Sequence, residues 1–295
     1  MKKITTIVLS ACIVTGITTL ATAKTSVWKV SKDERELYLG GTVHVLGADD
    51  YPLPCEYQMA YSKADTLVFE TDFSALNSAE FGQKALQAGM YPVGESLQQK
   101  IQPETKVRLE AYLSSIGIPA AAVMQFKPGM LMSMMMMTEL QRQGITTKGV
   151  DQYFTDLAIT DGKTIGELET IEQQLSFLTA LGVGDEERFI SYLIDGMGKL
   201  DQQFSAMIKT WRTGNLEGLS EASEIKQMRE EFPEVFEVLL HRRNNDWMPK
   251  IEDMLKTPEV EYVLVGTMHM AEDIGLLEQL SNRGYDIIQL DGCSG

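Results

Sequence analysis

Short runs of apolar residues, bounded by glycines and turn residues, stand near both ends of the chain. Such runs are typical of strands buried in a sheet. We predict strands at residues 26–30, 35–39, 67–69, 262–265 and 286–290, with a further candidate at 164–168. Strands at the two ends of a chain must meet to bury their faces, so we expect them to form one sheet.

The middle of the chain has the periodicity of helices instead. Pro103 and Glu104 open the first helical pattern in the way that helices often begin. We predict helices at residues 103–114, 130–142, 150–159, 171–181, 186–210, 221–231 and 235–255, the last interrupted or bent near Pro249. No low-complexity linker divides the chain. Residues 24–295 are therefore predicted to form a single α/β domain, with a central β-sheet built from N- and C-terminal segments and a large helical insertion.

The first residues resemble a targeting segment. Lys2 and Lys3 precede an apolar stretch, and Ala21-Thr22-Ala23 is a typical cleavage site. We predict that residues 1–23 are a signal peptide cleaved after Ala23, which makes the protein periplasmic or secreted. The apolar stretch is shorter than the ~20 residues of a spanning helix. A retained membrane anchor and a lipoprotein modified at Cys12 are less favoured alternatives.

Composition narrows the possible partners. The 295 residues carry a formal net charge of −16, which argues against non-specific nucleic-acid binding. Cys55 and Cys293 would both remain in an exported protein, where two cysteines favour a disulfide. Two separate buried thiols are the alternative.

The strongest motif is a duplicated frame, Gly-Thr-x-His, which ends in His44 and again in His269. Each frame directly follows a predicted strand, and strand ends are where α/β folds place their ligands. Imidazole is a metal ligand and a general base near neutral pH. Two satisfied core histidines would be the alternative, but only three histidines occur and two share the frame. The third, His241, is predicted to be a surface or packing residue on a helix.

Two further segments supply charged groups. Glu70, at the end of the predicted strand 67–69, could complete a His-His-Glu metal site or act as a general base. Asp72 is a weaker candidate, with loop capping as its alternative. Arg243 lies in a helical segment and could bind a developing anion. The alternative there is a solvated helix on which Trp247 packs against the core. The motifs of serine hydrolases, nucleotide enzymes and Rossmann dehydrogenases are absent from the sequence.

The chain resembles the TraB/GumN/Tiki family over nearly its whole length after residue 23. The resemblance rests on the two Gly-x-x-His frames and on the segments 28–30, 38–44, 52–54, 69–72, 94–97, 127–128, 149–151, 162–163, 168–170, 243–247 and 266–269, together with Gln173. It implies a fold similar to that of the erythromycin esterase and haem-uptake protein superfamily. It also implies a metal-dependent protease with His44, Glu70 and His269 as ligands, Arg243 as a helper, and Mn2+ or Co2+ as the divalent metal.

Four other residues match family positions, namely Asp151, Lys163, Glu169 and Gln173. Ion pairing and capping explain them equally well, so no catalytic role is assigned to them.

The resulting prediction is an exported metal-dependent hydrolase that acts on a peptide or other small substrate. A metal-free site is a variant of this prediction, since the related esterases imply that histidine and glutamate can act on water directly. A peptide- or ligand-binding envelope protein without turnover is the main alternative, and a metal- or haem-handling protein is a weaker one. The methionine-rich stretch 130–137 could line a peptide groove, although a buried helix face is the favoured interpretation.

Overall fold

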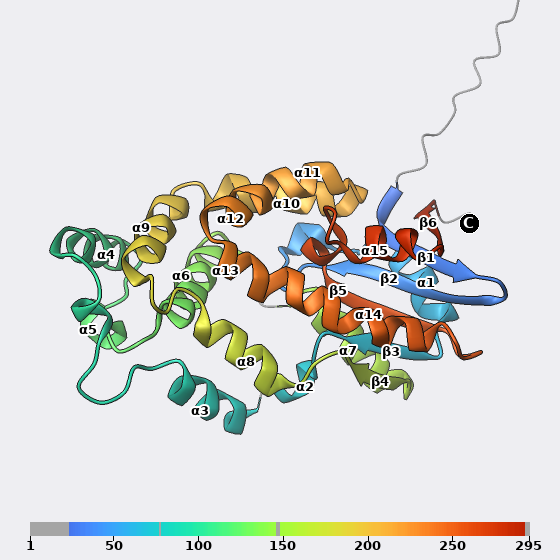
Figure 1. The fold of residues 1–295 in the computed structure, drawn as a ribbon, viewed down its shortest axis with the longest axis horizontal. Coiled ribbons are helices and arrows are strands. Elements are labelled where there is room, and N and C mark those ends of the chain that lie inside the picture. Colours follow the sequence, from blue (N-terminus) through green and yellow to red (C-terminus); the bar gives the residue numbers. More distant parts are fainter. Residues whose placement is uncertain (1–23, 77, 146–147, 293–295) are drawn as a thin grey trace, which may run out of the picture.

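The computed structural model describes residues 24–76, 78–145 and 148–292 (Figure 1). The predicted signal peptide, residues 1–23, and Cys293 lie outside the described residues. Within the described chain, six strands form one sheet in the order β4-β3-β5-β2-β1-β6. Their bounds are β1 Lys24–Lys32, β2 Arg35–Thr42, β3 Thr66–Phe69, β4 Thr164–Glu167, β5 Glu261–Gly266 and β6 Asp286–Asp291. A single sheet built from both ends of the chain is thereby confirmed, with β4 added from the helical insertion.

The direction of the strands determines where a site can form. β1 runs antiparallel to both β2 and β6, whereas β2, β5, β3 and β4 are parallel to one another. Thr42 pairs with Gly266, and Phe69 pairs with Leu264. The carboxyl ends of β2, β5 and β3 therefore meet at one edge of the sheet.

Alternating side chains of the strands supply two apolar layers. Tyr262 and Leu264 face one layer, while Val263 and Val265 face the other, as the period of two requires. Three helices cover the first face through aromatic side chains such as Trp211, namely α1 (Cys55–Lys63), α7 (Val150–Asp161) and α10 (Leu200–Thr213). Two helices cover the second face, namely α14 (Arg242–Met254) and α15 (Leu276–Asn282).

The helices occupy the following residues: α1 Cys55–Lys63, α2 Phe73–Leu76, α3 Ala79–Ala88, α4 Pro103–Ser115, α5 Ala120–Val123, α6 Pro128–Arg142, α7 Val150–Asp161, α8 Ile171–Ala180, α9 Glu186–Met197, α10 Leu200–Thr213, α11 Leu216–Ala222, α12 Ile225–Glu231, α13 Pro233–Phe236, α14 Arg242–Met254 and α15 Leu276–Asn282. Short 3-10 segments are η1 Ala48–Asp50, η2 Leu97–Gln99 and η4 Thr267–Met270, and η3 Glu237–His241 is a π-helical segment. Helices α4, α5, α6 and α9 gather at the end of the molecule away from the sheet (Figure 1). They share a separate apolar core there.

Three predicted helices differ from the observed ones. The predicted helix 186–210 is two helices, α9 and α10. The first helix ends before Gly198, and the second begins after Lys199. The predicted helix 221–231 spans the end of α11 and all of α12, and Glu224 between them has a positive φ of 51°. The predicted helix 235–255 is interrupted by the π-helical segment η3. The interruption predicted near Pro249 is not found, because α14 continues through that residue.

The methionine-rich stretch lies on α6. Met135 is buried, and Met132, Met134 and Met136 are partly buried against the same core. This agrees with the favoured interpretation of a core-facing helix.

Cys55, at the start of α1, is disulfide-bonded. The C-terminal segment reaches the same place, because the Gly292 amide donates to Glu56 Oε1 at 2.8 Å. Pairing with Cys293 stays a prediction, since that residue lies outside the described chain. None of the helices in the described residues has the length and apolar character needed to cross a bilayer.

Candidate functional site

The two Gly-Thr-x-His frames meet at the carboxyl edge of the sheet. His44 follows shortly after the end of β2, and His269 lies in η4 directly after β5. A Cβ atom on Gly41 would lie 2.7 Å from Thr267 Oγ1, so the glycine of the first frame leaves space for the threonine of the second. The duplicated pattern therefore has a packing reason, because the frames lie against each other on neighbouring parallel strands.

Glu70 joins them from the end of β3. A Cβ atom placed on Gly266 would lie 3.1 Å from Glu70 Oε1, 3.6 Å from His269 Cδ2 and 3.9 Å from His44 Nε2. The three residues predicted as metal ligands thus surround one glycine. A larger residue at position 266 would press on the Glu70 carboxylate.

His44 is the accessible member of the group, with 57% of its side chain exposed. Its Nδ1 lies 2.9 Å from Oδ2 of the buried Asp151, in the first turn of α7. Gly149 permits this contact, since a Cβ there would lie 2.2 Å from the backbone of His44. The surrounding protein lowers the pKa of His44, but the charge and hydrogen bond of Asp151 outweigh this and raise the pKa to about 9. His44 is therefore mostly an imidazolium at neutral pH.

His269 is buried and has the opposite character. Its Nδ1 lies 2.6 Å from Asn244 Oδ1, which is an acceptor, so Nδ1 carries the proton in the neutral ring. Its Nε2 accepts from Arg243 Nη1 at 3.2 Å. Burial and the neighbouring Arg243 charge lower the pKa of His269 to about 3, which keeps the ring neutral. The ring packs on Trp247 with centroids 4.4 Å apart.

Glu70 is buried and remains ionised. Burial raises the pKa of its carboxyl, but Arg243 and the two histidines hold it well below its usual range. Oε1 accepts from the Gly266 amide at 2.6 Å and lies 3.9 Å from His269 Nε2. Oε2 accepts from Arg243 Nη2 at 2.5 Å and from Gln174 Nε2 at 3.1 Å.

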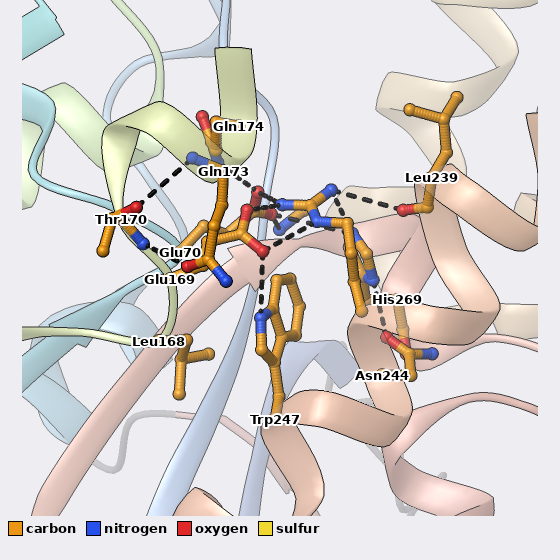
Figure 2. A network of polar contacts seen from close by, with 12 residues as sticks. Glu70, Leu168, Glu169, Thr170, Gln173, Gln174, Leu239, Asn244, Trp247 and His269 are labelled. Atoms are coloured by element: carbon orange, nitrogen blue, oxygen red, sulfur yellow. Dashed lines mark hydrogen bonds and ion pairs between the residues drawn. The ribbon is translucent and has the colours of Figure 1, made fainter. Parts of the chain in front are cut away.

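Arg243 links the carboxylates to His269. Its Nε and Nη2 donate to Glu169 at 3.1 and 2.5 Å. Figure 2 shows Glu70 and Glu169 on one side of this network and His269 and Asn244 on the other, with Trp247 between them. The Trp247 indole donates to Glu169 Oε2 at 3.2 Å. Arg243 is therefore part of the centre that the sequence predicted, and not a solvated helix residue.

Several candidates lie elsewhere. Asp72 is exposed and caps the start of α2 by accepting from the Ser74 and Ala75 amides. Capping is the predicted alternative to a functional role for this residue. Arg242 and Asn245, which flank Arg243 and Asn244 in the sequence, are exposed on α14. His241 contacts Glu237 within its own helical segment and stacks on Phe236, as expected for a packing residue.

Of the four other residues that match family positions, two belong to the centre and two do not. Asp151 and Glu169 contact its members directly. Lys163 donates to the backbone carbonyls of Tyr61 and Ala64, and Gln173 forms a capping box with Thr170. A sequence signal existed for Asp151, because it shares a buried helix face with Phe154, Thr155 and Ala158. No comparable signal marks Gln174.

The support of the two histidine rings favours a metal ion, whereas the position of Arg243 opposes one. Each histidine has its Nδ1 held by an oxygen, the usual support of a metal-binding imidazole. However, Arg243 donates to both Glu70 and His269, so a permanent cation already faces two of the three expected ligands. In the described chain, no group of three or more His, Cys, Asp or Glu side chains is arranged to hold a metal. As arranged, these residues do not fit a metal ion, and the divalent metal stays a prediction.

The fold and centre define a class: a single-domain α/β protein with paired histidines, a buried glutamate and an arginine at one sheet edge. The chain belongs to the TraB/PrgY/gumN family, whose model matches residues 26–289. It is 24% identical over 254 residues to the uncharacterized protein YbaP of Escherichia coli strain K12, a match that covers 83% of this chain and 88% of that protein. The same values hold for YbaP of Shigella flexneri. No solved structure matches the chain.

Proposed function

We propose that this protein is an exported hydrolase of peptide or related acyl bonds, with its centre formed by His44, Glu70, Arg243 and His269. The convergence of His44 Nε2, Glu70 Oε1 and the His269 ring around Gly266 carries the proposal. Buried charged groups are costly, and an assembly of strongly shifted titratable groups beside an accessible imidazole is typical of catalytic sites.

His44 is the group that would move the proton. Asp151 holds its Nδ1, so Nε2 is directed away from that contact and the exposed ring can reach a substrate. In its neutral form the ring takes a proton from water as the water oxygen attacks the carbonyl carbon. The same proton then passes to the leaving nitrogen or oxygen when the acyl bond breaks.

Glu70, Arg243 and His269 would supply the electrostatic environment. The negative charge that develops on the carbonyl oxygen is stabilised by protonated His44, while Arg243 offsets the charge of the neighbouring Glu70. All five N–H groups of Arg243 already have acceptors, so we assign it a charge effect and not direct binding of the oxyanion. Glu70 remains ionised and can orient the attacking water.

A metal-dependent form of the same activity is the second candidate. The held Nδ1 atoms of both histidines favour it. As arranged, His44, Glu70 and His269 do not fit an ion, so this form would need the centre to rearrange. Arg243 would then have to give up its contact with His269.

The test is hydrolysis of a fluorescence-quenched peptide library and of p-nitrophenyl butyrate, with EDTA or with added Mn2+ or Co2+. We expect His44→Ala to lower kcat/KM by about 100-fold or more, as for loss of a general base. His241→Ala is the matched control, because it removes a histidine outside the centre. Metal content is measured on the same preparations.

The outcomes separate the candidates. Turnover that persists in EDTA supports the metal-free hydrolase, whereas turnover that needs Mn2+ or Co2+ supports the metal-dependent form. Tight binding of a peptide without cleavage would replace both with a peptide-binding protein. Equal activity of the wild type and His44→Ala would exclude the proposed centre.

Export is part of the proposal. The disulfide at Cys55 supports it, because disulfides persist mainly in oxidising compartments. N-terminal sequencing of protein from a periplasmic extract should begin at Lys24. Recovery of uncleaved protein from the cytoplasm alone would contradict export.

A further inference from the structure

Glu169 stands beside Glu70 for a reason that lies in the sheet. The Leu168 amide donates to Phe69 O and the Glu169 amide donates to Glu70 O, both at 2.9 Å. The pairing of β3 with β4 thus continues past the ends of both strands. The carboxylates of Glu70 and Glu169, which follow the neighbouring parallel strands β3 and β4, are thus brought side by side, and each side chain is only 4% exposed.

Glu169 contacts Arg243 at two guanidinium nitrogens, whereas Glu70 contacts it at one. Glu169 accepts from both Nε and Nη2, which fixes the plane of the guanidinium. Glu70 accepts from Nη2 alone. With that plane fixed, Nη1 points to the Leu239 carbonyl and to His269 Nε2, each at 3.2 Å.

Glu169 also contacts Trp247, the second residue that packs beside His269. Its Oε2 accepts from the Trp247 indole, and the indole packs against both the His269 ring and the Arg243 guanidinium, which lies 4.7 Å from the Trp247 ring centroid. Two independent contacts of one buried carboxylate therefore determine the surroundings of His269 Nε2.

We propose that Glu169 is a positioning residue: it orients Arg243 and Trp247 so that Arg243 reaches Glu70 and His269 together, without itself touching the substrate. The catalytic part of this inference rests on the proposed hydrolase. The orientation of Arg243 and Trp247 around His269 does not depend on that function. The catalytic part and the orienting part can therefore be tested separately.

The experiment compares Glu169→Gln with Glu167→Gln. Glu167 ends β4 two residues earlier and is exposed, so it is a matched control. In Glu169→Gln, the new carboxamide nitrogen would face an arginine donor and break the bidentate contact. We expect kcat to fall by about 10- to 100-fold, as for a small misplacement of catalytic groups. KM should stay within about twofold, because Glu169 does not touch the substrate. Glu169→Asp, which retains the charge, should recover part of the loss.

A second readout needs no activity. The protein has three histidines, so the ring nitrogens of His269 can be assigned by NMR with His44→Ala and His241→Ala as references. Glu169→Gln should shift the His269 Nε2 resonance, because the Arg243 donor moves. Glu167→Gln should leave the resonance unchanged.

Each result decides the inference. A shifted His269 resonance in Glu169→Gln, with a wild type that shows no hydrolysis, retains the positioning role and overturns the proposed function. An unchanged resonance together with an unchanged kcat in Glu169→Gln overturns the positioning role. If Glu169→Gln does not fold, Trp247→Phe removes the indole donor to Glu169 together with part of the ring that packs on His269. An unchanged His269 resonance in that variant likewise overturns the inference.

Discussion

Residue environment separates two histidines that the sequence presents as equivalent. His44 is accessible and paired with a carboxylate, whereas His269 is buried and faces an arginine. The pKa of His44 is therefore raised to about 9 and that of His269 lowered to about 3. The centre holds one ring that can exchange a proton and one that stays neutral. The frame predicted which residues meet, but their roles depend on Asp151 and Arg243, neither of which lies in a frame.

Asp151→Asn tests this assignment. Asparagine still accepts the Nδ1 proton but has no charge, so the pKa of His44 should fall from about 9 towards or below its ordinary value. The pH at which kcat/KM reaches its plateau should fall with it, because the neutral base then forms at lower pH. NMR titration of the His44 ring measures the pKa directly. An unchanged titration midpoint would contradict the role of Asp151.

Gly266→Ala tests the convergence of the three groups. The new Cβ would lie 3.1 Å from Glu70 Oε1 and close to both histidines, so either the carboxylate or η4 must shift. We expect a loss of about 1–3 kcal/mol in unfolding free energy together with reduced turnover. Gly196→Ala on α9 is the control, since its Cβ would meet nothing within 4 Å. Chemical denaturation of both variants measures the difference, and equal stability would argue against the close packing.

At the scale of elements, the strands were easier to predict than the helices. The central strands β3 and β5, for example, are short apolar runs whose burial can be read locally. The break between α9 and α10, in contrast, occurs within a continuous helical pattern and is marked only by Gly198. The π-helical segment η3 has no evident local signal. It ends directly before α14, which carries Arg243 and Asn244, the two residues that hold His269. Irregular helical turns of this kind are frequent at functional sites.

The contact between β2 and α7 gives a prediction at this scale. Gly149 lies against the backbone after β2, and a Cβ there would approach His44 within 2.2 Å, which no side-chain movement can relieve. Gly149→Ala should displace the start of α7 and separate Asp151 from His44. We expect a larger loss of stability than for Gly266→Ala and a His44 pKa that returns towards its ordinary value. Retained stability with an unchanged His44 titration would show that α7 does not depend on this contact.

At the scale of the whole molecule, the buried charges at the two ends of the parallel strands affect folding differently. The carboxyl edge of the parallel strands holds the centre, where each buried charge has a partner. The opposite edge holds Glu261 at the start of β5, which is buried and has an Oε2 without a hydrogen-bond partner among the described residues. Burial raises the pKa of Glu261 to about 7. This carboxyl therefore opposes folding where it is ionised, unlike Glu70.

Glu261→Gln should show this as a stability difference that depends on pH. Below about pH 4.5 the carboxyl is protonated in both the folded and unfolded chain, so its titration changes nothing. Between that pH and about 7 the unfolded chain loses the proton first, and the stability of the wild type falls as pH rises. Above about pH 7 the penalty is constant. The variant should therefore be more stable than the wild type by about 1 kcal/mol or more at about pH 8, with little difference at about pH 4.5. Thermal unfolding at both pH values measures it, with Glu34→Gln as the control, because Glu34 is exposed in the turn between β1 and β2. A variant that gains equally at both pH values would show that the effect comes from packing and not from the charge of Glu261.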